Sequence, residues 1–186
     1  MTLIEAALLL LLVHGALGAV DTFFHHEWLE RLPHRPFAAR ELALHGARSL
    51  SFVLIFGGLA WFEWRGAWGW VLLGLLGVET LLTLADSVVE DRTRVLRASE
   101  RINHMLLAMN TGAYTAFLGW QVVAEWRHAT TALVPTRHPL LSELLTACAL
   151  VIAAWVLRDG LAAIRMARMP AARDEGPASP RSPTPA

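Results

Sequence analysis

The hydrophobic pattern divides the chain into five long apolar blocks, separated by shorter segments that hold most of the charge. A membrane-spanning helix needs about 20 largely apolar residues to cross the hydrocarbon core of a bilayer. The blocks approach this length and run over Thr2–Val20, Ala47–Phe62, Ala67–Ala85, Met105–Ala124 and Leu140–Leu157. The pattern predicts an all-α fold, a polytopic membrane helix bundle with about five transmembrane helices.

Ionisable residues in four of the predicted helices recur at steps of three, four or seven, which places them on one face of each helix. Charged groups inside a membrane are costly to desolvate, so they normally face the interior of a bundle. The four stripes are His14, Asp21 and His25; Glu41, His45 and Arg48; Glu79, Thr83, Asp86 and Glu90; and Glu100 and His104. We therefore expect a four-helix core lined by polar side chains.

The depth of each polar residue follows from the helical rise of about 1.5 Å per residue. By this measure Asp21 and Asp86 lie at one level near the inner end of their helices, and the other acids and histidines at that end share it. The convergent set is Asp21, His25, His45, Asp86, Glu90, Glu100 and His104. His14 and Glu79 are expected roughly 16 Å deeper than His25 and Glu90, near the middle of the bilayer.

Composition and charge fit a membrane protein. Hydrophobic residues make up 55% of the 186 residues, whereas soluble domains hold fewer. The formal net charge is zero, so there is no electrostatic case for a nucleic-acid partner. The apolar pattern ends near residue 169, and residues 170–186 are rich in Pro, Ser and Ala. We expect residues 1–169 to form the bundle and residues 170–186 to form a disordered cytoplasmic tail.

The basic residues predict the orientation of the helices. All sixteen are Arg, and they gather between the first and second blocks, between the third and fourth, and after the fifth. Because positive charge is retained on the cytoplasmic side of a membrane, this distribution places the N-terminus outside and the C-terminus in the cytoplasm.

The convergent set has the chemistry of a metal site. Bundles that project Glu, Asp and His inward from facing helices hold pairs of metal ions, and carboxylate with imidazole suits iron, manganese or zinc. We expect two transition-metal ions, with iron favoured, and His14, Glu79, Arg48 and Arg97 as supporting or substrate-binding residues. The spacing Glu100-x3-His104 is one residue longer than the step common in soluble di-iron bundles. Taken alone, His26 and Arg94 read as solvated charge at a membrane edge.

The polar motifs also carry a resemblance that covers roughly residues 1–165. They are Asp21-x3-His25-His26-Glu27, Glu41-Leu42-x2-His45-x2-Arg48, Glu79-Thr80 with Asp86, and Glu90-Asp91-x2-Arg94-x-Leu96-x3-Glu100-Arg101-x2-His104. The chain resembles small bacterial multi-pass membrane proteins, similar segments of which are fused ahead of epimerase-like Rossmann domains. The resemblance implies a bacterial inner-membrane location but brings no reaction with it. No G-x-G-x-x-G segment follows a strand pattern here, so the sequence gives no sign of a nucleotide-binding domain.

Three functions remain open from the sequence. The first is a non-haem, di-iron oxidoreductase acting on a lipid-soluble substrate or quinone. The second is a membrane anchor that binds haem through two histidines, taken from His14, His45 and His104. The third is a proton- or ion-coupled transporter, or an accessory subunit of a membrane complex, with His14 and Glu79 on a proton path. Homo-oligomers are compatible with all three.

Overall fold

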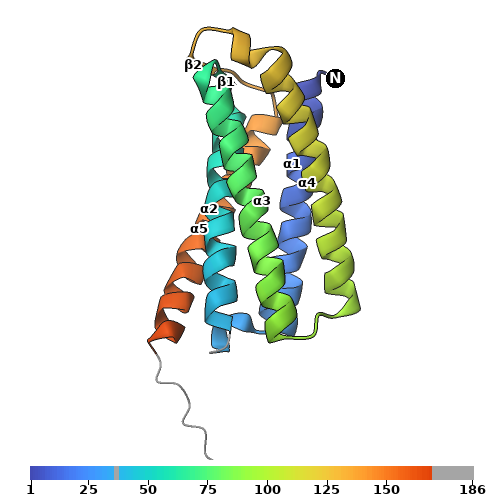
Figure 1. The fold of residues 1–186 in the computed structure, drawn as a ribbon, viewed down its shortest axis with the longest axis vertical. Coiled ribbons are helices and arrows are strands. Elements are labelled where there is room, and N and C mark those ends of the chain that lie inside the picture. The colour runs from blue at the N-terminus through green and yellow to red at the C-terminus, as the bar shows by residue number, and fades with distance from the viewer. Residues whose placement is uncertain (36–37, 169–186) are drawn as a thin grey trace, which may run out of the picture.

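The structure is a computed structural model and describes residues 1–35 and 38–168. Five long helices run side by side in it (Figure 1). They are α1 (Leu3–Val20), α2 (Ala39–Trp61), α3 (Ala67–Thr93), α4 (Ala98–Ala124) and α5 (Leu141–Ala167). The predicted all-α bundle is confirmed. The tail expected at residues 170–186 lies outside the described residues.

Every helix extends beyond its apolar block, and all the extensions lie at the same end of the bundle. The chain of α1 continues as a π-helix, η1 (Asp21–Leu29), and α2 begins at Ala39, eight residues before its apolar block. At the same end α3 continues to Thr93 and α4 begins at Ala98. These added turns carry acids and histidines that are buried among the helices, which is why hydropathy alone ends the helices too early.

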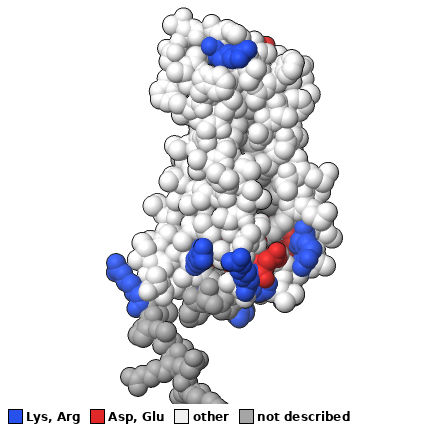
Figure 2. All heavy atoms as spheres, in the orientation of Figure 1, with Lys and Arg blue, Asp and Glu red and all other residues white. Residues whose placement is uncertain are grey.

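The surface of the bundle is suited to a bilayer. Within the described residues, four helical segments are long and apolar enough to cross a membrane, namely Leu3–Leu29, Ala39–Trp61, Ala67–Thr93 and Leu141–Ala167. Many large apolar side chains point outward, among them Leu81, Leu150 and Leu161. On the face that Figure 2 shows, the described charged side chains lie at the two ends and leave the middle band uncharged. The chain therefore has the features of a multi-pass membrane protein.

Among the five long helices of the described residues, α4 is the one that is not among these four segments. It has 27 residues, as α3 and α5 do, but it buries Asn103, Asn110 and Gln121 against its neighbours. The amides of Asn103 and Asn110 donate hydrogen bonds to the backbone carbonyls of Leu17 and Leu10 in α1, at 3.2 and 2.9 Å. These bonds fix α4 against α1, and its membrane crossing stays a prediction.

The end of the bundle away from the buried acids is closed by a pair of short strands. β1 (Phe62–Arg65) pairs antiparallel with β2 (Ala132–Pro135), which links the α2–α3 connection to the α4–α5 connection. Trp64 in β1 and Trp126 in the short 3-10 helix after α4, η4 (Trp126–His128), are buried. Both rings pack into the hydrophobic core. The paired strands hold both loops in place above the apolar core.

Gly58 of α2 allows the Trp64 ring to pack against the helix. A Cβ atom added at Gly58 would overlap this ring, whereas no described atom lies within 4 Å of a Cβ added at Gly74 in α3. Overpacking a filled core costs about 1–3 kcal/mol. We expect Gly58→Ala to lower the Tm of the detergent-solubilised protein by several degrees. Gly74→Ala is the matched control and should leave the Tm unchanged or raise it, because Ala favours helix. Equal effects of the two changes would contradict this packing.

Candidate metal centre

The π-helix η1 brings two adjacent histidines close to one carboxylate. In an α-helix, residues five apart point about 140° away from each other, whereas the i→i+5 repeat of a π-helix aligns them. His25 Nδ1 lies 3.2 Å from Asp21 Oδ1, and His26 Nε2 lies 3.7 Å from Asp21 Oδ2. All three side chains are buried. The π-helix is the local cause of the inward position of His26.

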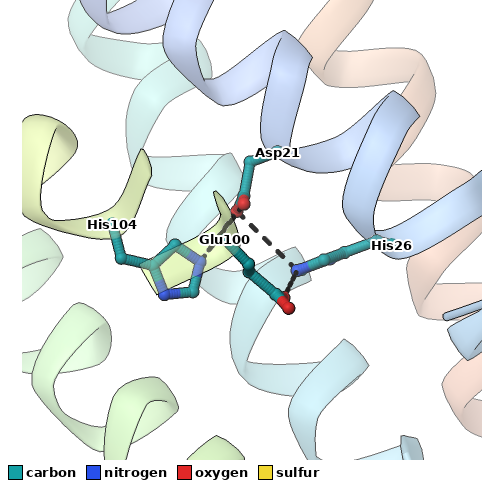
Figure 3. Close-up of side chains that lie close together, drawn as sticks. All are labelled: Asp21, His26, Glu100 and His104. Atoms are coloured by element: carbon teal, nitrogen blue, oxygen red, sulfur yellow. Dashed lines mark hydrogen bonds and ion pairs between the residues drawn. The ribbon is translucent and has the colours of Figure 1, made fainter. Parts of the chain in front are cut away.

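Four side chains from η1 and α4 point toward one another and form what we call the Asp21 cluster: Asp21, His26, Glu100 and His104 (Figure 3). His104 Nε2 lies 3.2 Å from Asp21 Oδ1, and His26 Nε2 lies 3.8 Å from Glu100 Oε1. One ligand atom from each residue lies within 4.8 Å of all the others. Two carboxylates and two imidazoles thus surround a single position.

A second group, His26, Glu41 and Glu90, adjoins the Asp21 cluster and shares His26 with it; we call it the Glu41 group. Its side chains come from η1, α2 and α3. His26 Nε2 lies 3.9 Å from Glu90 Oε1, and His104 Nδ1 lies 3.5 Å from Glu90 Oε2. The two groups together bring carboxylates or imidazoles from η1, α2, α3 and α4 to one level.

Arg94, just after α3, supplies the positive charge of this level. Its Nη2 atom lies 2.9 Å from Glu41, 3.4 Å from Glu90 and 2.6 Å from Glu100. Burial alone would lower the pKa of the Arg94 guanidinium, but the hydrogen bonds and charges of Glu100 and Glu41 outweigh it and raise this pKa above its ordinary value. Arg94 is therefore a permanent cation between three helices.

Arg94 contacts three of the four carboxylates that are buried around the two candidate metal groups. Asp21, Glu41, Glu90 and Glu100 are each at most 3% exposed. Burying a charge without a partner costs several kcal/mol. Arg94 contacts Glu41, Glu90 and Glu100, while Asp21 is held by imidazoles and by the Asn103 amide at 3.3 Å. The arrangement therefore has the electrostatic character of a cation site.

The imidazole of His26 has the geometry of a metal ligand. Among the described residues, its Nε2 atom has no hydrogen-bond partner, although carboxylate oxygens of Asp21, Glu90 and Glu100 lie 3.7–3.9 Å away. These separations are too long for hydrogen bonds. Ligand atoms that bind a four-coordinate ion at 2.0–2.2 Å lie about 3.4 Å apart. The residues present therefore fit a transition-metal ion.

The other predicted ligands lie around these two groups. His25 Nε2 lies 3.3 Å from the Ser99 hydroxyl, so both of its ring nitrogens already have polar neighbours. His45 Nδ1 lies 3.1 Å from Arg48 Nη2, and Arg48 pairs with Asp86 at 3.5 Å. The structure thus brings Asp21, Glu90, Glu100 and His104 together and places His25, His45 and Asp86 beside them.

The predicted supporting residues separate into two sets. His14, Glu79 and Arg48 line an apolar cavity of about 700 Å³ that His45 and His104 also line. Arg97 instead pairs with Glu30 at 2.8 Å, and its side chain is 54% exposed. His104 belongs to the Asp21 cluster and also lines the cavity, so a molecule in the cavity can approach the candidate metal position.

Three residues of the site were missed by sequence reasoning. His26 and Arg94 were read as solvated charge, but their side chains are 4% and 7% exposed. Glu41 was placed on the polar stripe of its helix and left out of the ligand set. The spacing Asp21-x4-His26 does not fit an α-helical face and becomes informative only in a π-helix.

Comparisons with protein families, with characterised proteins and with solved structures find no match to this chain. The proposed function therefore rests on the fold and on the geometry of the site.

Arg94 should be required for the stability of the metal-free protein. Removing one partner of a buried ion pair costs about 3–5 kcal/mol, and Arg94→Leu would leave three carboxylates without their cation. We expect this variant to lower the Tm of chelator-treated protein by roughly 10 °C. Arg92→Leu, at an exposed position in the last turn of α3, should have little effect. A Tm for Arg94→Leu equal to that of the control would contradict the role given to Arg94.

Proposed function

We propose that the protein is a membrane-embedded, non-haem metal oxidoreductase that acts on a lipid-soluble substrate. The observation that supports this most is the unpartnered Nε2 atom of His26, among carboxylate oxygens of Asp21, Glu90 and Glu100 at 3.7–3.9 Å. These groups come from three different parts of the bundle and are buried together. Intramembrane ionisable clusters of this kind mark functional sites.

The donor set favours iron, manganese or zinc. Carboxylate and imidazole are the ligands that these ions share, and Cys148, the only cysteine in the sequence, lines the cavity and is not part of either ligand group. Iron is our proposal because it supplies the redox change that an oxidation requires. His104 and His26 would bind the ion together with Asp21 and Glu100. His25 and Asn103, which contact Asp21, would fix the orientation of its carboxylate.

A second ion would use the Glu41 group. Arg94 already neutralises the carboxylates there, and His26 offers a single free nitrogen to both groups. We propose that the first ion binds in the Asp21 cluster. A two-iron centre then forms only when the Arg94 guanidinium withdraws from Glu41 and Glu90.

The cavity supports a substrate drawn from the bilayer. It is lined mainly by apolar residues from all five helices and reaches His104 of the Asp21 cluster. Arg48 also lines it and can bind a polar headgroup or a quinone oxygen. Substrate bound there would lie beside the ion and away from water.

The proposed location and orientation of the protein are those that the sequence predicts. We propose a bacterial inner-membrane protein with the N-terminus outside, so that the metal centre lies toward the cytoplasmic side. Lipid is the partner that the apolar surface supports.

Metal analysis of the purified protein tests the proposal. We expect one to two iron, manganese or zinc ions per chain, bound in detergent after desalting. His26→Ala should lower the metal content severalfold, because it removes the ligand common to both groups. His128→Ala, an exposed position in the turn after α4, should retain the metal.

The same sample distinguishes the alternatives. A non-haem centre gives no Soret band, whereas a bis-histidine haem protein gives a strong one. Less than one transition-metal ion per chain after growth in metal-supplemented medium would contradict the proposed centre.

A further inference from the structure

A second polar level lies beside the cavity, away from the metal centre. It contains His14 from α1, Glu79 from α3 and Tyr114 from α4. These side chains are 8%, 1% and 0% exposed. Seven residues of helix separate His14 from Asp21, and Glu79 from Asp86, which places this level about 10 Å from the metal level. Neither candidate metal group includes any of the three.

The polar atoms of this level are incompletely hydrogen-bonded. Within the part of the chain that the structure describes, His14 Nδ1, Glu79 Oε2 and the Tyr114 hydroxyl have no hydrogen-bond partner. The other Glu79 oxygen, Oε1, accepts a hydrogen bond from the Thr83 hydroxyl at 2.8 Å. Each buried polar group left unpaired costs about 1–3 kcal/mol. A membrane bundle that retains several such groups in one place has a use for them.

The orientation of these groups is fixed by their neighbours. The His14 ring packs against Phe52 at 4.7 Å between ring centroids, and edge-on against Tyr114 at 5.4 Å. The Tyr114 hydroxyl also lies near the side chains of Glu79 and Thr111. His14 and Glu79 both line the cavity, and their unpaired atoms lie just beneath its surface.

We propose that His14 and Glu79 bind the hydroxyl group of an apolar alcohol or phenol held in the cavity. A hydroxyl both donates and accepts, so it can donate to Glu79 Oε2 and accept from His14. The remaining lining is suited to a hydrocarbon body and includes Phe52, Phe56 and Ile152. A volume of about 700 Å³ is in the range of sites that enclose a small organic ligand.

This site sets which part of the ligand reaches the metal centre. With its hydroxyl at Glu79, an extended molecule points its other end toward His104, which lines the same cavity. The atoms about 10 Å from the hydroxyl would then lie beside the Asp21 cluster. The identification of this ligand as the substrate rests on the proposed function. Binding of the ligand in the cavity does not require a metal.

Photolabelling of the metal-free protein tests the site. The probes are 1-decanol carrying a mid-chain diazirine and the matching decane diazirine, used on chelator-treated protein in phosphatidylcholine nanodiscs. Mass spectrometry then locates the label. We expect the alcohol to label cavity residues of α5, such as Cys148 and Ile152, up to about tenfold more than the hydrocarbon does, since a hydrogen bond that only the alcohol forms is worth up to this much.

Two variants test whether the preference for the alcohol depends on the side chains of Glu79 and His14. Glu79→Met and His14→Phe replace the polar atoms with apolar ones of similar size, which a membrane bundle tolerates, and each should remove most of the preference for the alcohol. Glu143→Met, at an exposed position at the start of α5, should retain it.

Equal labelling by the two probes in the unmodified protein would overturn the proposal. So would a preference that both cavity variants retain, or stronger competition by 1-decylamine than by 1-decanol, which would indicate an ammonium site. Because no metal is present, failure here leaves the proposed metal centre standing, and absence of metal binding leaves this site standing.

Discussion

The arrangement of the bundle depends on the burial of four carboxylates at one level. Asp21, Glu41, Glu90 and Glu100 come from four helical segments and are almost fully excluded from solvent. Their mutual repulsion in a medium of low dielectric constant would separate the helices unless cations hold them together. Arg94 supplies one such cation by contacting three of the four. The unpartnered His26 nitrogen identifies the place for another.

The same constraint connects the metal level with the cavity. His104 contacts Asp21 on one side and lines the apolar cavity on the other. The polar residues deeper in the cavity, His14 and Glu79, lie about two helical turns away. A molecule from the bilayer would thus meet a hydrogen-bonding group at one end and the acidic level at the other. The distance between these two levels would determine which part of the bound molecule lies beside the acidic level.

Sequence reasoning could predict the helices and the polar level, because hydropathy and helical periodicity report both directly. Asp21, Glu90, Glu100 and His104 were found in this way. His26 was not, since the periodicity of an α-helix directs it away from Asp21 and only the π-helix brings it inward. Arg94 follows the end of α3, and a charged residue at a helix end is normally predicted to be exposed to solvent. The paired strands were missed because four-residue strands at loop positions carry little pattern.

Anomalous diffraction at the iron absorption edge, from crystals of the protein loaded with ferrous iron, tests the central claim most directly. The account predicts a peak at bonding distance, about 2.0–2.2 Å, from His26 Nε2 and from carboxylate oxygens of Asp21 and Glu100. A crystal loaded with iron in which the peak lies elsewhere, with His26 Nε2 hydrogen-bonded to a neighbouring carboxylate instead, would contradict it.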